Sequence, residues 1–213
     1  PPLPPLSPSF SHRLEDDDVS GATGACNSLA IACQFLPECR EELAASGALD
    51  CVLRLAASCN RSAPHVALLG AALRVLNAVA ASAEVNDALF NPPARDGELV
   101  SILVDFLQMY RDKEAVFKAT LKLVQAGWDN DRLQDDEELS FRCAVTAPSI
   151  EKRLKDIHKA LAGRVKAKQQ IQSLSQSRGP ASSSSSISSD PTFLSLQQLT
   201  ALMSVLGFAV SEL

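Results

Sequence analysis

The chain is poor in aromatic residues, which make up 5% of its 213 residues. Its apolar residues reach 46% and are mostly leucine, alanine and valine. These residues favour helices over sheets, so the composition predicts an all-α fold with a packed core. We recognise neither a signal peptide nor an uninterrupted apolar run that would span a membrane. Because the chain begins with Pro1 and not with Met, we expect a fragment or a processed chain.

Motifs for catalysis and metal binding are also lacking. No two of the six cysteines are spaced Cys-x-x-Cys, and none of the three histidines stands near them at ligand spacing. The stretch "SGATGAC" lacks the Gly-Lys-Ser/Thr of a phosphate-binding loop. We therefore expect no enzyme activity, no metal and no cofactor. In a reducing compartment we expect the cysteines to be small buried residues, and they are Cys26, Cys33, Cys39, Cys51, Cys59 and Cys143.

The net charge of −5 is unevenly distributed. Residues 150–178 carry +6, which leaves −11 for the rest of the chain. Such a division predicts a segment with its own acidic partner, such as tubulin tails, nucleic acid or an anionic membrane, and the alternative is a solvated helix face. The segment has no interleaved aromatic residues, which argues against nucleic acid, and its apolar stripe also fits a calmodulin target. The candidate basic surface comprises Lys152, Arg153, Lys155, Lys159, Arg164, Lys166 and Lys168.

Helical patterns fill most of the chain, with caps at both ends of the last helix. Ser149 is the expected N-cap of a long helix, Asp190-Pro191 starts the last one and Gly207 ends it. The expected organisation is a disordered Pro-rich and acidic linker at 1–20, armadillo-like repeats at 21–147, a long basic helix at 148–174, a flexible Ser-rich linker at 175–190, and a C-terminal helix at 191–213 that packs on the repeats.

An internal repeat supports this organisation. Gly47 recurs as Gly97 at an offset of 50, and "LRVLNA" at 73–78 recurs as "LKLVQA" at 121–126 at an offset of 48. A period of about 40–50 residues with a short helix, a Gly corner and two longer helices is typical of armadillo and HEAT repeats. The stretch "LVDFLQMYRDKEAVF" is then the corner between two helices of one repeat. The expected stacking residues are Tyr110, Phe117 and Trp128.

The last helix of each repeat carries a candidate peptide groove. In armadillo proteins an amide side chain there donates to and accepts from the backbone of an extended peptide. Asn77 occupies this place in "LRVLNA", and Gln125 occupies it in the next unit. The alternative is a polar residue at the edge of an apolar stripe. The candidate groove comprises Arg74, Asn77, Lys118, Lys122 and Gln125.

Two stretches carry a resemblance to a known family. The first is "LVSILVDFLQMYRDKEAVFKATLKLV", with Leu-Gln-Met-Tyr-Arg followed by Phe-Lys-x-Thr, and the second is "DPTFLSLQQLTALMSVLGF". Both are similar to the C-terminal region of the abnormal spindle family, the microcephaly-associated spindle-pole proteins. The resemblance implies an armadillo-like region, protein partners at the mitotic spindle pole, microtubules and katanin among the associates, and a place in the cytoplasm and cytoskeleton at the spindle pole or centrosome, with a nuclear location in interphase.

Calmodulin binding is a separate question, because the family carries IQ motifs. The nearest match here, "IQSLSQSRG", has Gln176 and Ser177 where such a motif needs a basic residue and Gly. Calmodulin is therefore a less favoured partner, and we expect neither nucleic acid nor a membrane. Three hypotheses remain: a non-enzymatic spindle scaffold, a generic armadillo adaptor that binds peptides away from the spindle, and a module regulated by calmodulin.

Overall fold

The computed structural model describes residues 16–82, 85–90, 98–130, 141–176 and 190–209. These residues form helices and no strand, which confirms the all-α fold. The helices are α1 (Asp16–Phe35), α2 (Pro37–Ala45), α3 (Ala48–Ala57), α4 (Ala63–Ala80), α5 (Asn86–Phe90), α6 (Glu98–Met109), α7 (Glu114–Asn130), α8 (Phe141–Val145), α9 (Pro148–Gln176) and α10 (Pro191–Val205).

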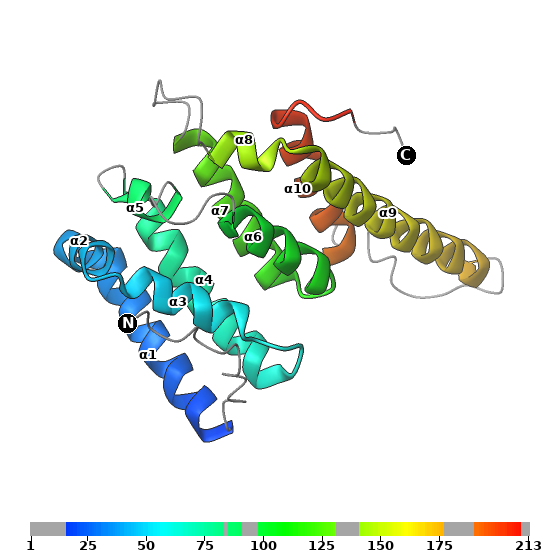
Figure 1. Ribbon diagram of the computed structural model, residues 1–213. Coiled ribbons are helices and arrows are strands. Elements are labelled where there is room, and N and C mark those ends of the chain that lie inside the picture. Colours follow the sequence, from blue (N-terminus) through cyan, green and yellow to red (C-terminus); the bar gives the residue numbers. More distant parts are fainter. Residues whose placement is uncertain (1–15, 83–84, 91–97, 131–140, 177–189, 210–213) are drawn as a thin grey trace, which may run out of the picture.

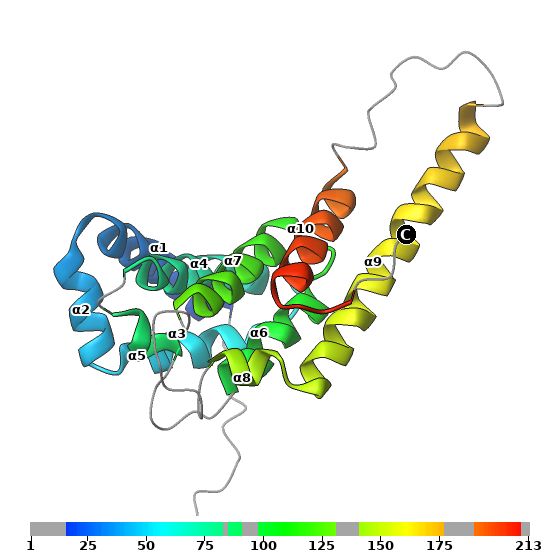
Figure 2. The same ribbon diagram turned by 90° about the horizontal axis from the view of Figure 1, so that it is seen from above.

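The helices lie in two rows, which Figures 1 and 2 show from two directions. Helices α1, α4, α7 and α10 form one row, in which each helix packs against the next. Helices α3, α6 and α9 lie along the other side and pack against α4, α7 and α10, respectively. A short helix, α2, α5 or α8, precedes each member of this second row. The same order of three helices, a short one followed by a member of the second row and then by a member of the first row, therefore recurs as α2–α3–α4, α5–α6–α7 and α8–α9–α10 in the described part of the chain.

Helix α4 is the centre of the core. Its leucines Leu68, Leu69, Leu73 and Leu76 are fully buried, and α1, α3 and α7 pack around it. By length and composition α4 is also apolar enough to cross a membrane. Its packing against three other helices accounts for the same composition, because most of its surface is covered by apolar neighbours and only a narrow side, which carries Arg74, faces solvent.

Tyr110 joins two corners of the stack. It follows α6, and its hydroxyl lies 2.9 Å from the carbonyl oxygens of both Cys59 and Asn60, which follow α3. Next to it, Arg61 and Asp112 form an ion pair at 2.7 Å. The two corners are about one repeat period apart in sequence, so these contacts tie equivalent points of neighbouring units together. The charged stretch after Tyr110 is the tight turn between α6 and α7.

Phe117 and Trp128 are also buried, on α7. The Trp128 ring lies under the guanidinium group of Arg142, 4.3 Å from the ring centroid, which links α7 to α8. Gly127 stands next to Trp128, and a Cβ atom there would come within 2.6 Å of the Phe141 ring. The absence of a side chain at Gly127 thus allows α8 to approach α7 closely.

The predicted ends of two helices are confirmed. Asp190 caps α10 by accepting a hydrogen bond from the backbone N–H of Thr192 at 2.8 Å. Gly207 ends this helix with φ of 76°, and the N–H of Phe208 donates to the carbonyl oxygen of Met203. Gly47 likewise has φ of 71° between α2 and α3. Both glycines adopt the left-handed conformation that closes a helix, which side chains with a Cβ rarely adopt.

Three expectations about helix positions need correction. Helix α1 begins at Asp16, inside the segment 1–20 that was expected to be a linker. Acidic residues at a helix N-terminus are favoured by the helix dipole, so the acidic run starts a helix instead of ending a tail. Helix α9 begins at Pro148, one residue before its expected N-cap Ser149, and proline suits a first helical turn. Helix α8 was not foreseen, because five residues carry too little periodicity to be recognised.

The cysteines divide into three groups. Cys26, Cys33 and Cys59 are buried as expected, Cys39 is half-buried, and Cys51 and Cys143 are exposed. The expectation of buried residues was wrong for these two, because each lies on the solvent side of a helix whose other side is buried. The expected Ser-rich linker at 175–190 is shorter at both ends, because α9 continues to Gln176 and Asp190 caps α10. Residues 1–15, Gly97, residues 131–140 and residues 177–189 lie outside the described residues.

Burial raises the pKa of Tyr110 to about 12, with a smaller contribution from the neighbouring Cys59 thiol. Because the folded-state pKa exceeds the unfolded value near 10, this stabilisation is complete below pH 10 and is lost as the pH rises towards 12. The chain has one tyrosine, and its single tryptophan does not ionise, so the change in absorbance at 295 nm with pH reports the ionisation of this tyrosine. We expect tyrosinate to appear only near pH 12 in the native protein, and near pH 10 in denaturant. A native transition at pH 10 would mean that the hydroxyl is exposed.

Candidate functional site

An open groove runs along the row formed by α1, α4 and α7, and it has a volume of about 680 Å³. These three helices lie side by side in Figures 1 and 2. The short helix α2 contributes one side chain, Arg40. The other lining residues are Asn27, Ala30, Ile31, Cys33 and Gln34 from α1, Arg74, Asn77 and Ala78 from α4 with Ala81 at its end, and Ala119 and Lys122 from α7.

Helical spacing explains which residues face the groove. On α1 the lining residues fall within positions 27–34, and on α4 within 74–81. Each set spans two turns of one helix face, because residues three, four and seven apart share a side. The two sets are 47 residues apart, close to the repeat period seen in the sequence. Helix α1 is therefore the equivalent of α4 in the preceding position of the row.

Asn77 lies in the groove but acts first as a link between helices. Its side-chain nitrogen donates to the carbonyl oxygen of Leu73 at 2.8 Å and to that of Ala119, on α7, at 3.0 Å. Both amide protons are therefore committed within the protein. The expectation that Asn77 donates to a bound peptide is wrong, and only its oxygen Oδ1, which has no partner among the described residues, is left to accept.

Arg74 and Lys122 also line the groove, whereas Lys118 and Gln125 do not. Arg74 crosses to α1, where it donates to the Asn27 side chain. Lys118 pairs with Glu114 on its own helix. The internal repeat places Lys122 level with Arg74 and Gln125 level with Asn77. Of these two α7 residues, Lys122 lines the groove beside Ala119, and Gln125 is not among the described lining residues.

Sequence reasoning missed the contribution of α1 and α2. Asn27, Ile31 and Gln34 were not considered, since the first helix had no identified partner in the repeat. The signal was present, because the spacing 27, 31, 34 matches 74, 78, 81 at the same offset. Arg40 could not have been found this way, as α2 has no equivalent role in the later units.

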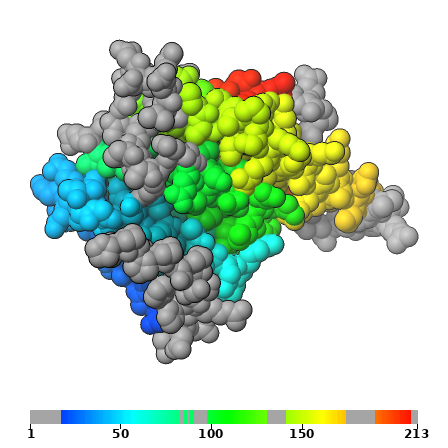
Figure 3. All heavy atoms as spheres, in the orientation of Figure 1, coloured from blue at the N-terminus to red at the C-terminus, as the bar shows by residue number. Residues whose placement is uncertain are grey.

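The predicted basic surface on α9 separates into a lysine stripe and two structural ion pairs. We define the lysine stripe as Lys152, Lys155, Lys159 and Lys166, which are all exposed. Their spacing of three, four and seven residues places them on one side of α9, over about 21 Å of helix. The opposite side carries the buried stripe of Ile150, Leu154, Ile157, Leu161 and Val165. Figure 3 shows α9 in yellow along the surface of the molecule.

Two of the other basic residues of α9, Arg153 and Lys168, hold neighbouring elements. Arg153 pairs with Asp105 on α6, and its guanidinium lies 3.5 Å from the hydroxyl of Ser101. Within the stripe, Lys155 pairs with Glu151 at 2.6 Å. Arg164 is exposed on the same flank of the helix as Arg153, eleven residues away. The seven residues therefore do not form one continuous basic surface.

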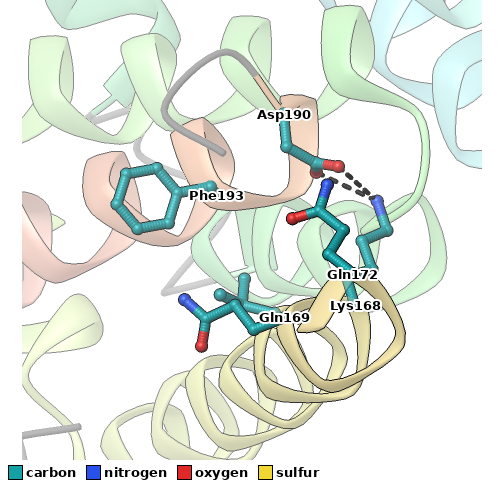
Figure 4. A pocket seen from close by; sticks show the side chains of 6 residues that line it. Lys168, Gln169, Gln172, Asp190 and Phe193 are labelled. Atoms are coloured by element: carbon teal, nitrogen blue, oxygen red, sulfur yellow. Dashed lines mark hydrogen bonds and ion pairs between the residues drawn. The ribbon is translucent and has the colours of Figure 1, made fainter. Parts of the chain in front are cut away.

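Lys168 fastens the start of α10 to α9 (Figure 4). Its Nζ atom donates to both carboxylate oxygens of Asp190, at 2.9 and 2.8 Å, and to the hydroxyl of Thr192 at 2.9 Å. The hydrogen bond from Lys168 lowers the pKa of Asp190. The cavity beside this pair is about 10 Å³, room for about one water molecule and too small for a ligand.

Comparison with known proteins gives partial matches to one group. Over 105 residues, 49% of this chain, it is 31% identical to the abnormal spindle-like microcephaly-associated protein homolog of Mus musculus, 33% to that of Saimiri boliviensis boliviensis and 30% to the protein of Homo sapiens. The chain spans about 3% of the length of these relatives. This likeness supports a family relationship over half of the chain. No family model matches, and no solved structure matches.

The link made by Asn77 can be tested against Gln125, the other residue of the predicted amide pair. We expect Asn77→Ala to lower the free energy of unfolding by about 1–2 kcal/mol, because it removes the hydrogen bond to Ala119 on α7 and a second one to Leu73 within α4. Gln125→Ala should change it by less than about 0.5 kcal/mol, because this side chain only reaches Asp129 on the same helix. Urea unfolding followed by circular dichroism measures both. Equal effects would mean that Asn77 does not join α4 to α7.

The cap of α10 gives a second test. We expect Asp190→Ala to lower the free energy of unfolding by about 1 kcal/mol at pH 7, because it removes both the N-cap and the Lys168 partner. Asp156→Ala, at an exposed position on α9, is the control. Since the folded-state pKa of Asp190 is depressed, its contribution is present above the unfolded pKa and is lost as the pH falls through the folded value. The difference between the two proteins should therefore shrink in acid, and a constant difference would contradict this assignment.

Proposed function

We propose that this chain is a non-enzymatic protein-interaction module of a microtubule-associated spindle protein, and that it helps to organise the mitotic spindle. The observation that carries the proposal is the likeness over 105 residues to abnormal spindle-like microcephaly-associated proteins. The recurring order of short, second and third helices supports an armadillo-like stack, in which each unit buries its apolar side against the next. Such a stack serves as a rigid platform for partners.

The lysine stripe supplies the contact with an acidic surface in this proposal. Its four charges lie along one exposed side of α9, so they can face a flat or extended partner at the same time. The acidic tails of tubulin are such a partner. The inner side of α9 packs on α6, α8 and α10, so binding there would require unfolding. The same packing argues against capture of α9 by calmodulin, which needs the apolar side of its target helix.

The proposed location follows from the proposed role, which is the spindle pole or centrosome in mitosis. A peptide-binding adaptor that acts away from the spindle is the second candidate, and the open groove along α1, α4 and α7 favours it. The two candidates differ in which surface is essential. The scaffold at the spindle requires the lysine stripe, whereas the adaptor requires the groove.

A test of the proposal is co-sedimentation with taxol-stabilised microtubules. The triple variant Lys152→Gln, Lys159→Gln, Lys166→Gln removes three charges of the stripe and leaves the Lys155–Glu151 pair intact. At about 0.5 kcal/mol per charge, we expect affinity to fall about tenfold. Binding by the unchanged chain should also weaken as salt rises from 50 to 200 mM, because salt screens this attraction.

The matched control is Arg54→Gln, Arg111→Gln, Lys113→Gln, which changes the net charge equally at positions outside α9. Thermal melting establishes that both variants are folded. If the control loses as much affinity as the stripe variant, the attraction depends on net charge alone. If the unchanged chain stays in the supernatant at both salt concentrations, the microtubule contact does not belong to this chain.

A further inference from the structure

The groove along α1, α4 and α7 is positively charged although the chain as a whole is acidic. Arg40, Arg74 and Lys122 line it, and no aspartate or glutamate is among its described lining residues. The net charge of the chain is −5. Placing three positive side chains around one groove costs free energy, because they repel one another. On an acidic protein, such a cluster indicates a site that attracts anionic groups.

Two polar atoms in the groove are buried and have no hydrogen-bond partner among the described residues. One is the donor Nε of Arg40 and the other is the acceptor Oδ1 of Asn77. A buried polar group left without a partner costs about 1–3 kcal/mol, and more when it is charged. In native structures such a group calls for an explanation, such as strain, a catalytic role or an ordered water or ion. Here both atoms belong to residues that line the groove, so the polar groups at its wall are not fully paired.

The floor and one edge of the groove suit a polypeptide. Ala30, Ala78, Ala81 and Ala119 line it with small side chains, which lets the main chain of a ligand approach closely. At the edge, the side chain of Ile31 is 59% exposed, a large value for an isoleucine beside a groove. It offers an apolar contact for a ligand side chain.

The geometry points to an extended acidic peptide of a partner protein as the ligand of this groove. A carboxylate of the ligand is attracted by the guanidinium groups of Arg40 and Arg74 and by the ammonium group of Lys122. An apolar side chain of the ligand contacts Ile31. Nucleic acid fits less well, because no described lining residue is aromatic and bases would have nothing to stack on. The assignment deepens the second candidate function, the peptide-binding adaptor, and rests on it, since it names the chemistry of the ligand; it does not depend on the lysine stripe, which lies on a different helix.

The test is selection from a random 12-residue peptide library displayed on phage, with the whole 213-residue chain as bait. We expect the recovered peptides to be enriched in aspartate and glutamate. Three recovered sequences are then made as fluorescein-labelled peptides, and their affinities are measured by fluorescence anisotropy. Each is compared with a version in which every acidic residue is replaced by its amide, which we expect to bind at least about tenfold more weakly.

Variants of the chain locate the binding. Arg40→Gln should weaken binding about tenfold, because it removes a charge-assisted hydrogen bond. Arg40→Lys keeps the charge but lacks the guanidinium donors, so its affinity for the peptides should lie between those of the unchanged chain and Arg40→Gln. Ala81→Trp should block binding by filling the groove without a change in charge. Arg54→Gln, an exposed arginine outside the groove, should bind normally. Melting temperatures show that each variant is folded.

Several outcomes would overturn the assignment. They are recovery of no peptides, recovery of basic or uncharged peptides, or equal binding by Arg40→Gln and Arg54→Gln. Displacement of the labelled peptides by a 20-nucleotide RNA at equal concentration would indicate a nucleic-acid groove instead. The triple lysine variant separates this question from the proposed function, because it should bind the peptides normally whether or not it binds microtubules.

Discussion

Helix α4 packs against three other helices, and the rest of the stack depends on these contacts. Each of its buried leucines gains about 1.5–3 kcal/mol when removed from water, so exposure of the side that carries them would be costly. Helix α1 covers one side, α3 a second and α7 a third. The repeat units are therefore not independent, because α4 is covered by α1, which precedes its unit, and by α7, which belongs to the next unit. A groove at this place is a by-product of the same row, since neighbouring helices with small facing residues leave a channel above their contact.

The helical class and most helix positions could be predicted from the sequence because they depend on local signals. Gly47, Gly207 and Asp190 act through their own backbone or side-chain geometry, and each marks a helix end in the structure. The offset near 50 between similar stretches also had a physical origin, since Tyr110 reaches back to Cys59 and Asn60 across one period. Signals of this kind can be read directly from the amino-acid sequence.

The groove could be predicted only in part because it depends on how the helices pack against one another. Asn77 was placed in it correctly, but its amide protons bind Leu73 and Ala119. Gln125 matched Asn77 in sequence and yet is not among the residues that line the groove. A similar limit applied to the basic helix, where periodicity separates the lysine stripe from its flanks but cannot say that Arg153 pairs with Asp105 on another helix. Sequence patterns give the faces of helices, whereas the contacts between helices come from side-chain packing.

Helix α9 has 29 residues, whereas α6, on which its first half packs, has 12. Beyond Val165 the side chains of residues 166–171 are all exposed, and Figure 2 shows this end standing away from the stack. Its last turns therefore depend mainly on their own backbone hydrogen bonds, with Lys168 as the anchor to α10. Such turns exchange their amide hydrogens through local opening, at a lower free energy than the core helices require. A partner that bends or frays this end would meet little resistance, and the packed rows would keep their shape while it does so.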